Sequence, residues 1–117
     1  MAKAKPKYER GVIAADDAGF VRTTYFPDGT VVEVPVKWSE TLRVAAFKRN
    51  FFAYDLLCLG FETEEGTVEI DEQMEGWEAI TDALPKYLSG VRPIEDWFLE
   101  VVKPAFATNF TLIFPPQ

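Results

Sequence analysis

The stretch DLLCLGFE, residues 55–62, decides the fold. Successive side chains of a β-strand point to opposite faces of the sheet. The two faces here are Leu56 and Cys58 on one side, and Leu57, Leu59 and Phe61 on the other. Both are apolar, which is typical of a central strand with cover on each side. The pattern therefore predicts a helix on one face and, on the other, the inside of a closed barrel or a second subunit.

Further strands are predicted on both sides of this one. The turn sequences Pro27-Asp28-Gly29 and Glu64-Glu65-Gly66 each lie between segments rich in β-branched and aromatic residues, which favours hairpins. Pro35 has no N–H to donate, so its segment is expected at a sheet edge or a strand end. The five strands are expected at residues 20–26, 30–36, 42–49, 55–62 and 67–71.

The period of the apolar residues changes after residue 75. Trp77, Ile80, Leu84 and Leu88 recur at helical spacing, which predicts an amphipathic helix over residues 76–88, kinked or divided at Pro85. A second short helix is expected from Pro93 to Val101 or Val102. Residues 110–114 read as a last strand.

This order indicates an α+β fold: an antiparallel five-stranded meander or partly closed barrel, then two helices and a C-terminal strand. A chain of 117 residues, 48% of them apolar, suits one domain. Residues 1–18 carry no clear period and are interpreted as a mobile N-terminal arm. Residues 19–117 are then a single α+β domain.

The arrangement, with Trp38-Ser39-Glu40 before the third strand and a helix after the meander, resembles pleckstrin-homology-like small barrels. It is also similar to a family of small uncharacterised bacterial proteins. The motifs that carry this second resemblance are Phe47-Lys48-Arg49, Asp55-Leu56-Leu57-Cys58-Leu59, and Asp71-Glu72 with Met74-Glu75-Gly76-Trp77. The likeness covers roughly residues 19 to 114, and it implies a fold but no functional residue.

Charge is unevenly distributed along the chain. The net charge is -7, from 19 acidic and 12 basic residues, and no Lys or Arg lies between Arg49 and Lys86. Because phosphate binding needs clustered cations, nucleic acid is not expected as a partner. The carboxylates interpreted as an interaction surface are Glu62, Glu64, Glu65, Glu69, Asp71, Glu72, Glu75, Glu78 and Asp82.

A basic and aromatic cluster is predicted at a loop tip after the third strand. It comprises Lys48 and Arg49 with the aromatic loop Phe51, Phe52 and Tyr54. Two cations do not anchor a protein of this charge to an anionic membrane, so the aromatics are expected to pack under the sheet or against a second subunit. No segment is long and apolar enough to cross a bilayer, and no signal peptide begins the chain, so a cytoplasmic location is expected.

Few residues offer catalytic chemistry. The chain has no histidine, and Cys58 lies in an apolar strand where a thiol is expected to be buried and inert. Asp71, Glu72 and Glu75 form the one dense carboxylate group, which suggests a hydrolase or a calcium site, but it lacks the EF-hand order. No catalytic residue, metal ligand or cofactor is therefore predicted.

These observations favour a non-enzymatic protein-interaction module that presents an acidic surface to a basic protein, such as an antagonist of a basic toxin or nuclease. Two alternatives stay open: a small self-associating scaffold protein, and a carboxylate-based hydrolase. The number of large aromatic residues also predicts a weak symmetric homodimer.

Overall fold

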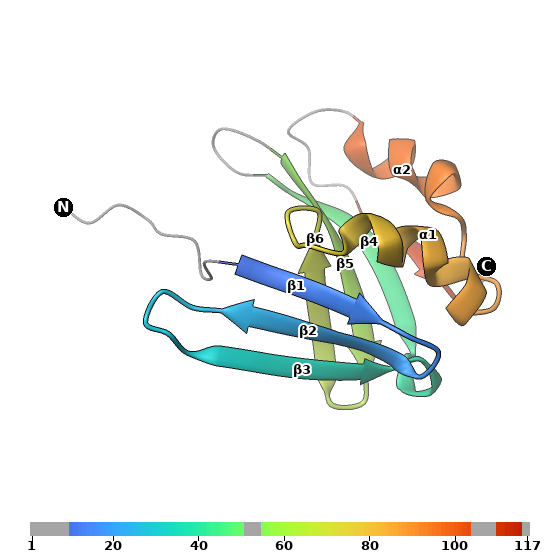
Figure 1. The fold of residues 1–117 in the computed structure, drawn as a ribbon. Helices are drawn as coiled ribbons and strands as arrows, with labels where there is room; N and C mark the ends of the chain where they lie inside the picture. Colours follow the sequence, from blue (N-terminus) through green and yellow to red (C-terminus); the bar gives the residue numbers. More distant parts are fainter. Residues whose placement is uncertain (1–9, 51–54, 104–109, 116–117) are drawn as a thin grey trace.

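The computed structural model describes residues 10–50, 55–103 and 110–115. These residues form seven strands in two antiparallel sheets, with two helices (Figure 1), so the α+β class is confirmed. The first sheet has the order β1-β2-β3, with β1 (Arg10–Ala15), β2 (Gly19–Tyr25) and β3 (Val31–Lys37). The second has the order β6-β5-β4-β7, with β4 (Arg43–Asn50), β5 (Asp55–Thr63), β6 (Gly66–Asp71) and β7 (Phe110–Phe114). The helices are α1 (Trp77–Tyr87) and α2 (Ile94–Val102).

The expected meander is interrupted between β3 and β4, and the sheets do not close into a barrel. A 3-10 turn at Trp38–Glu40 carries the chain from one sheet to the other. The Trp38 indole N–H donates to the Asp16 carbonyl at 2.8 Å, and its ring packs near Phe20, Phe61 and Tyr87. This buried anchor turns the chain away from β3, so β4 pairs with β5 and β7 instead.

Strand β1 corrects the expected boundary of the N-terminal arm. Its residues pair with β2 from Arg10↔Tyr25 to Ala15↔Phe20. The Asp16 carboxylate accepts the N–H groups of Ala18 and Gly19, which closes the tight turn between the two strands. The strand was missed because Ile13 is its one large buried side chain, so it shows little alternation. Residues 1–9 lie outside the described part of the chain.

The first sheet and the helices cover the same face of the second sheet. In Figure 1, β1, β2 and β3 form one layer, and the strands of the second sheet run steeply across this layer. The two helices lie beside the first sheet. The Phe20 and Phe61 rings join the two sheets, with centroids 4.7 Å apart in an edge-on contact. Ile80 and Leu84 of α1 and Trp97 of α2 complete the core cluster. Both predicted helices and the last strand are confirmed.

The outer face of β5 is covered by its own sheet. Phe47 lies opposite Cys58, and a Cβ built at Gly60 would be 3.3 Å from the Phe47 ring. The Arg49 guanidinium, 5.4 Å from the centre of that ring, donates to both carboxylate oxygens of Glu69. Side chains of β4 and β6 thus cover this face of β5. The sequence pattern had predicted a closed barrel or a second subunit as the cover.

Candidate functional site

Part of the predicted acidic surface is neutralised by arginine. Glu62 of β5 accepts from Arg43 of the neighbouring strand β4 at 2.6 Å, and Glu69 of β6 accepts from Arg49 of β4 at 2.8 Å, across the intervening strand β5. A third pair joins Glu75 to Arg10 of β1 at 2.9 Å. These cations lie outside the acidic stretch in the sequence but next to it in space. Arg43 and Glu62 lie directly opposite each other in the β4–β5 hairpin. Aligning the two strands of this hairpin in the sequence is the one way in which an ion pair of this surface was predictable.

Asp71 and Glu72 have structural roles. Asp71 is buried, and its carboxylate accepts the Gln73 N–H at 2.9 Å. The Glu72 carboxylate accepts the Leu57 N–H at 2.5 Å, and the Glu72 N–H donates to the Leu57 carbonyl at 3.0 Å. Together they extend the pairing of β5 and β6 by one step. The carboxylates weighed for hydrolysis or calcium therefore have separate partners, and within the described residues no three Asp, Glu or Cys side chains gather as metal ligands.

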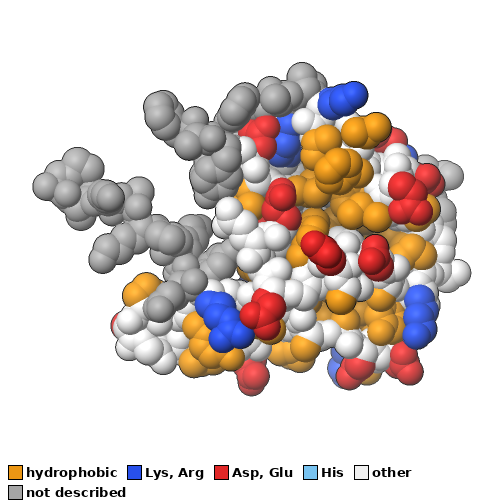
Figure 2. Space-filling model, turned by 45° about the horizontal axis from the view of Figure 1, so that its top comes forward, with side chains coloured by type: hydrophobic (Ala, Val, Ile, Leu, Met, Phe, Trp, Pro, Cys, Tyr) orange, Lys and Arg blue, Asp and Glu red, His pale blue; other side chains and the backbone are white. Residues whose placement is uncertain are grey.

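The other predicted surface residues lie at two separate places. Glu64 and Glu65 are exposed in the turn between β5 and β6, whereas Glu78 and Asp82 are exposed on α1. The length of β6, about 20 Å, separates the turn from the segment that leads to α1. Figure 2 shows acidic side chains interspersed with hydrophobic and basic ones on the helix side of the molecule. The turn carboxylates and the α1 carboxylates therefore lie at opposite ends of β6.

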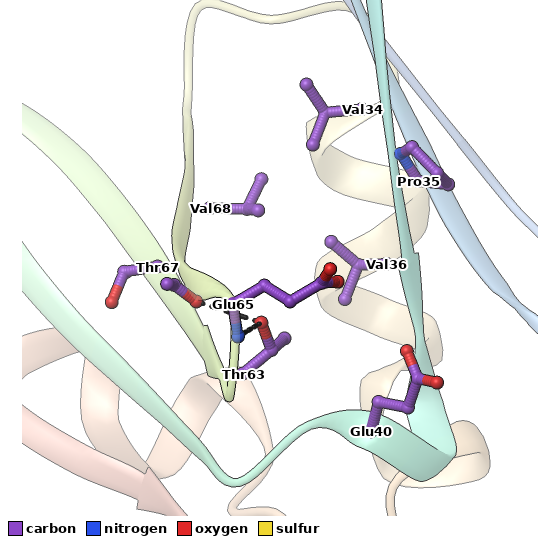
Figure 3. Close-up of a pocket in the computed structure, with 9 residues that line it drawn as sticks. Val34, Pro35, Val36, Glu40, Thr63, Glu65, Thr67 and Val68 are labelled. Atoms are coloured by element: carbon purple, nitrogen blue, oxygen red, sulfur yellow. Dashed lines mark hydrogen bonds between the residues drawn. The ribbon is translucent and has the colours of Figure 1, made fainter.

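A recess of about 180 Å³ lies between β3 and the β5–β6 turn. Figure 3 shows Val34, Val36 and Val68 around its apolar part, with the Glu65 side chain extending across it towards Val36 and Glu40 at the rim. The remaining lining residues are Pro35, Thr63, Gly66 and Thr67. The Thr63 hydroxyl donates to the Gly66 carbonyl and accepts the Glu65 N–H, which holds the turn in place.

The charge of this recess is negative. In the described part of the chain, neither Glu40 nor Glu65 forms an ion pair with a Lys or Arg. The neighbouring cation Arg22, paired with Val34 across the sheet, donates instead to the Glu69 carbonyl at 2.8 Å. Sequence reasoning missed Glu40 because it lines the same recess as Glu65 only when the two sheets pack together, and no local pattern reports that packing.

Cys58 is fully buried, as predicted. Burial raises the pKa of its thiol, and the nearby carboxylates of Glu69 and Asp71 raise that pKa further. A high thiol pKa keeps the sulfur protonated, and the thiolate is the reactive form. The lack of reactivity itself stays a prediction.

Lys48 corrects the expected loop cluster. It lies in β4 with 3% of its surface exposed, and its ammonium donates to the Val102 carbonyl at 2.8 Å and pairs with Asp55 at 3.3 Å. A cation at a helix C-terminus satisfies a free carbonyl and interacts favourably with the helix dipole, so Lys48 fixes the end of α2. The aromatic loop Phe51, Phe52 and Tyr54 lies outside the described residues.

Neither helix in the described part of the chain is long and apolar enough to cross a membrane. The resemblance to pleckstrin-homology-like barrels and to small bacterial proteins stays a prediction. Comparisons with protein-family models, with curated proteins and with solved structures find no match for this chain.

Proposed function

We propose that this chain is a non-enzymatic interaction module whose recess between β3 and the β5–β6 turn binds a basic side chain of a protein partner. The observation that carries the proposal is the combination of apolar walls with the carboxylates of Glu40 and Glu65, which have no cation partner among the described residues. The binding region is therefore narrower than the stretch from Glu62 to Asp82, and it includes a residue outside that stretch.

The chemistry of the recess suits lysine or arginine. Both have an apolar stem that packs against valine side chains and a charged head that stays near water or a carboxylate. Val34, Val36 and Val68 would contact the stem, and the carboxylates would receive the head. Hydrogen bonds between ionised groups are about twice as strong as neutral ones. The net charge of -7 would also speed the approach of a basic partner.

A basic toxin or nuclease is the concrete partner class that fits this chemistry. An antagonist of such a protein gains from electrostatic steering, because steering raises the association rate more than it raises affinity. The proposal therefore expects binding that weakens as salt is added.

The test is selection of peptides from a phage-displayed random library on the wild-type protein and on the Glu40→Gln/Glu65→Gln variant. A Glu78→Gln/Asp82→Asn variant, altered on exposed positions of α1, is the matched control. We expect the wild type and the control to enrich sequences containing Lys or Arg, and the recess variant to lose that enrichment. Enrichment of sequences without Lys or Arg, or equal enrichment on all proteins, would overturn the proposal.

A further inference from the structure

Strand β3 has an open outer edge. The residues of antiparallel strands alternate between positions that bond to the partner strand and positions that point away from it. The Phe26 N–H donates to Thr30 and the Trp38 N–H donates to Ala18, so even-numbered residues of β3 bond to β2. Odd-numbered residues of β3 consequently direct their backbone groups outward. The outward residues are Val31, Glu33, Pro35 and Lys37.

Each of the other three edge strands has at least one backbone group that bonds to a segment outside its own sheet. On β1, the Ile13 N–H donates to the Glu75 carbonyl at 2.7 Å. On β6, the Glu69 carbonyl accepts from Arg22, and on β7 the Ile113 carbonyl accepts from the Arg92 N–H at 3.2 Å. These contacts occupy part of each edge, and an unoccupied edge is where a strand of another chain can pair.

Within the described residues, the N–H groups of Val31, Glu33 and Lys37 donate to no acceptor. Pro35 has no N–H, and the Lys37 carbonyl accepts the Thr41 hydroxyl at 3.0 Å. The free stretch of the edge therefore runs from Val31 to the carbonyl of Pro35, which is enough for a short strand. Val31 is also 52% exposed, so an apolar side chain lies at this edge in contact with solvent.

We infer that an extended segment of the basic partner adds to β3 as a further strand and places a Lys or Arg side chain in the recess. Strand addition supplies main-chain hydrogen bonds for affinity, while pockets for alternate side chains supply specificity. The recess borders this same edge, because Pro35 lines it together with its neighbours Val34 and Val36. Every second side chain of an added strand would point to the side on which Val34 and Val36 lie.

This inference rests on the proposed function and names the form of the partner. A basic segment fits this edge better than a second copy of the chain does. A second copy would bring another charge of -7 and a second Pro35, which removes one more N–H from the shared ladder.

The test uses a defined probe, the peptide acetyl-Thr-Val-Arg-Val-Thr-amide, titrated into the labelled protein and followed by amide NMR. Three altered peptides accompany it: two with alternate backbone nitrogens methylated, one in each register, and one with citrulline in place of arginine. The protein variants are Glu33→Pro and its matched control Glu33→Gln. Proline removes an outward N–H and leaves the β2–β3 bonds in place, whereas glutamine removes only the charge.

We expect the parent peptide to shift the amide signals of Val31 and Glu33. One of the two methylated peptides and the citrulline peptide should each bind the wild-type protein about tenfold more weakly than the parent peptide does. The Glu33→Pro protein should bind the parent peptide about tenfold more weakly, and the Glu33→Gln protein should bind it as the wild type does. The methylated peptides test the inference even if Glu33→Pro does not fold.

Each other outcome is decisive. Equal binding of all methylated peptides, with binding still weakened by Glu65→Gln, overturns strand addition and leaves the proposed function standing. Binding indifferent to citrulline and to Glu40→Gln/Glu65→Gln overturns both. The inference is overturned if millimolar peptide shifts no amide signal, or if the Val31 signal shifts with protein concentration alone. In either case the proposed function is still tested by the library selection.

Discussion

The carbonyl oxygen of Ile13 occupies the space that a side chain at Gly76 would need. A Cβ built at Gly76 would lie 2.2 Å from that oxygen, and the φ angle of Gly76 is +95°. The neighbouring Glu75 N–H donates to the Gly11 carbonyl at 2.9 Å, so this short parallel bridge joins β1 to the start of α1. The first sheet and the first helix are thus tied together by backbone, at a position where only glycine fits.

Gly76→Ala should therefore destabilise the protein much more than Gly29→Ala. Both glycines have a positive φ, but a Cβ at Gly29 would meet nothing within 4 Å. Gly29→Ala should lower the free energy of unfolding by about 1 kcal/mol through backbone strain alone. Gly76→Ala should add a steric loss of roughly 1–3 kcal/mol. Urea unfolding measures both, and equal losses would contradict the close contact with Ile13.

Phe61→Ala should lower the free energy of unfolding by roughly 3–5 kcal/mol, because it leaves a cavity between the two sheets. Phe61 is fully buried and touches Phe20 edge-on. The matched control is Phe110→Ala, at a residue that is 71% exposed, where the change should stay within about 0.5 kcal/mol. Denaturant unfolding checks both values. A loss at Phe110 as large as that at Phe61 would show that Phe110 is covered in solution.

Lys48→Met should destabilise the protein by about 3 kcal/mol, since it leaves Asp55 and the end of α2 without the buried ammonium. Hydrogen exchange should also become faster in α2 than in α1. Lys86→Met, at an exposed position of α1, is the control and should have little effect. Adding Asp55→Asn to Lys48→Met should recover part of the loss. If exchange rises equally in both helices, Lys48 does not act through the end of α2.

Cys58 should make stability depend on pH in the alkaline range. Its raised pKa keeps the thiol protonated in the folded protein, while the unfolded chain ionises above about pH 8.5. The contribution of the protonated Cys58 thiol to the free energy of unfolding is complete below that pH. It declines as pH rises, by up to about 1.4 kcal/mol per pH unit. The wild type should lose stability faster than Cys58→Ala over this range. Thiol reagents should label Cys58 only on unfolding; rapid labelling of the native protein would refute its burial.

A weak symmetric homodimer remains a prediction, now for a different reason. The outer face of β5 is covered within the chain, but Leu99 is 57% and Phe110 71% exposed. Light scattering should show mass rising with concentration, and Phe110→Ser should reduce that rise. A strictly monomeric mass at millimolar protein would exclude the dimer.

The elements that follow from local pattern were predictable, and those that depend on packing between distant segments were not. Alternation and turn residues placed β2 to β6, and helical spacing placed both helices. The division into two sheets depends on the burial of Trp38 against Phe20 and Phe61, whose rings meet only in the folded chain. The same holds for the site: the acidic residues can be counted in the sequence, but their pairing with Arg43 and Arg49 on another strand depends on the folded sheet.

The backbone contacts on β1, β6 and β7 bear on any assembly built through strand pairing. Among the described residues, β1, β6 and β7 each have a backbone group bonded to another segment, whereas the β3 edge has no such bond from Val31 to the carbonyl of Pro35. Continuous fibrils need two free edges on every subunit, because each chain must pair above and below. Pairing along β3 alone, as inferred above, would therefore end in a discrete complex, because each chain would then offer one edge rather than two.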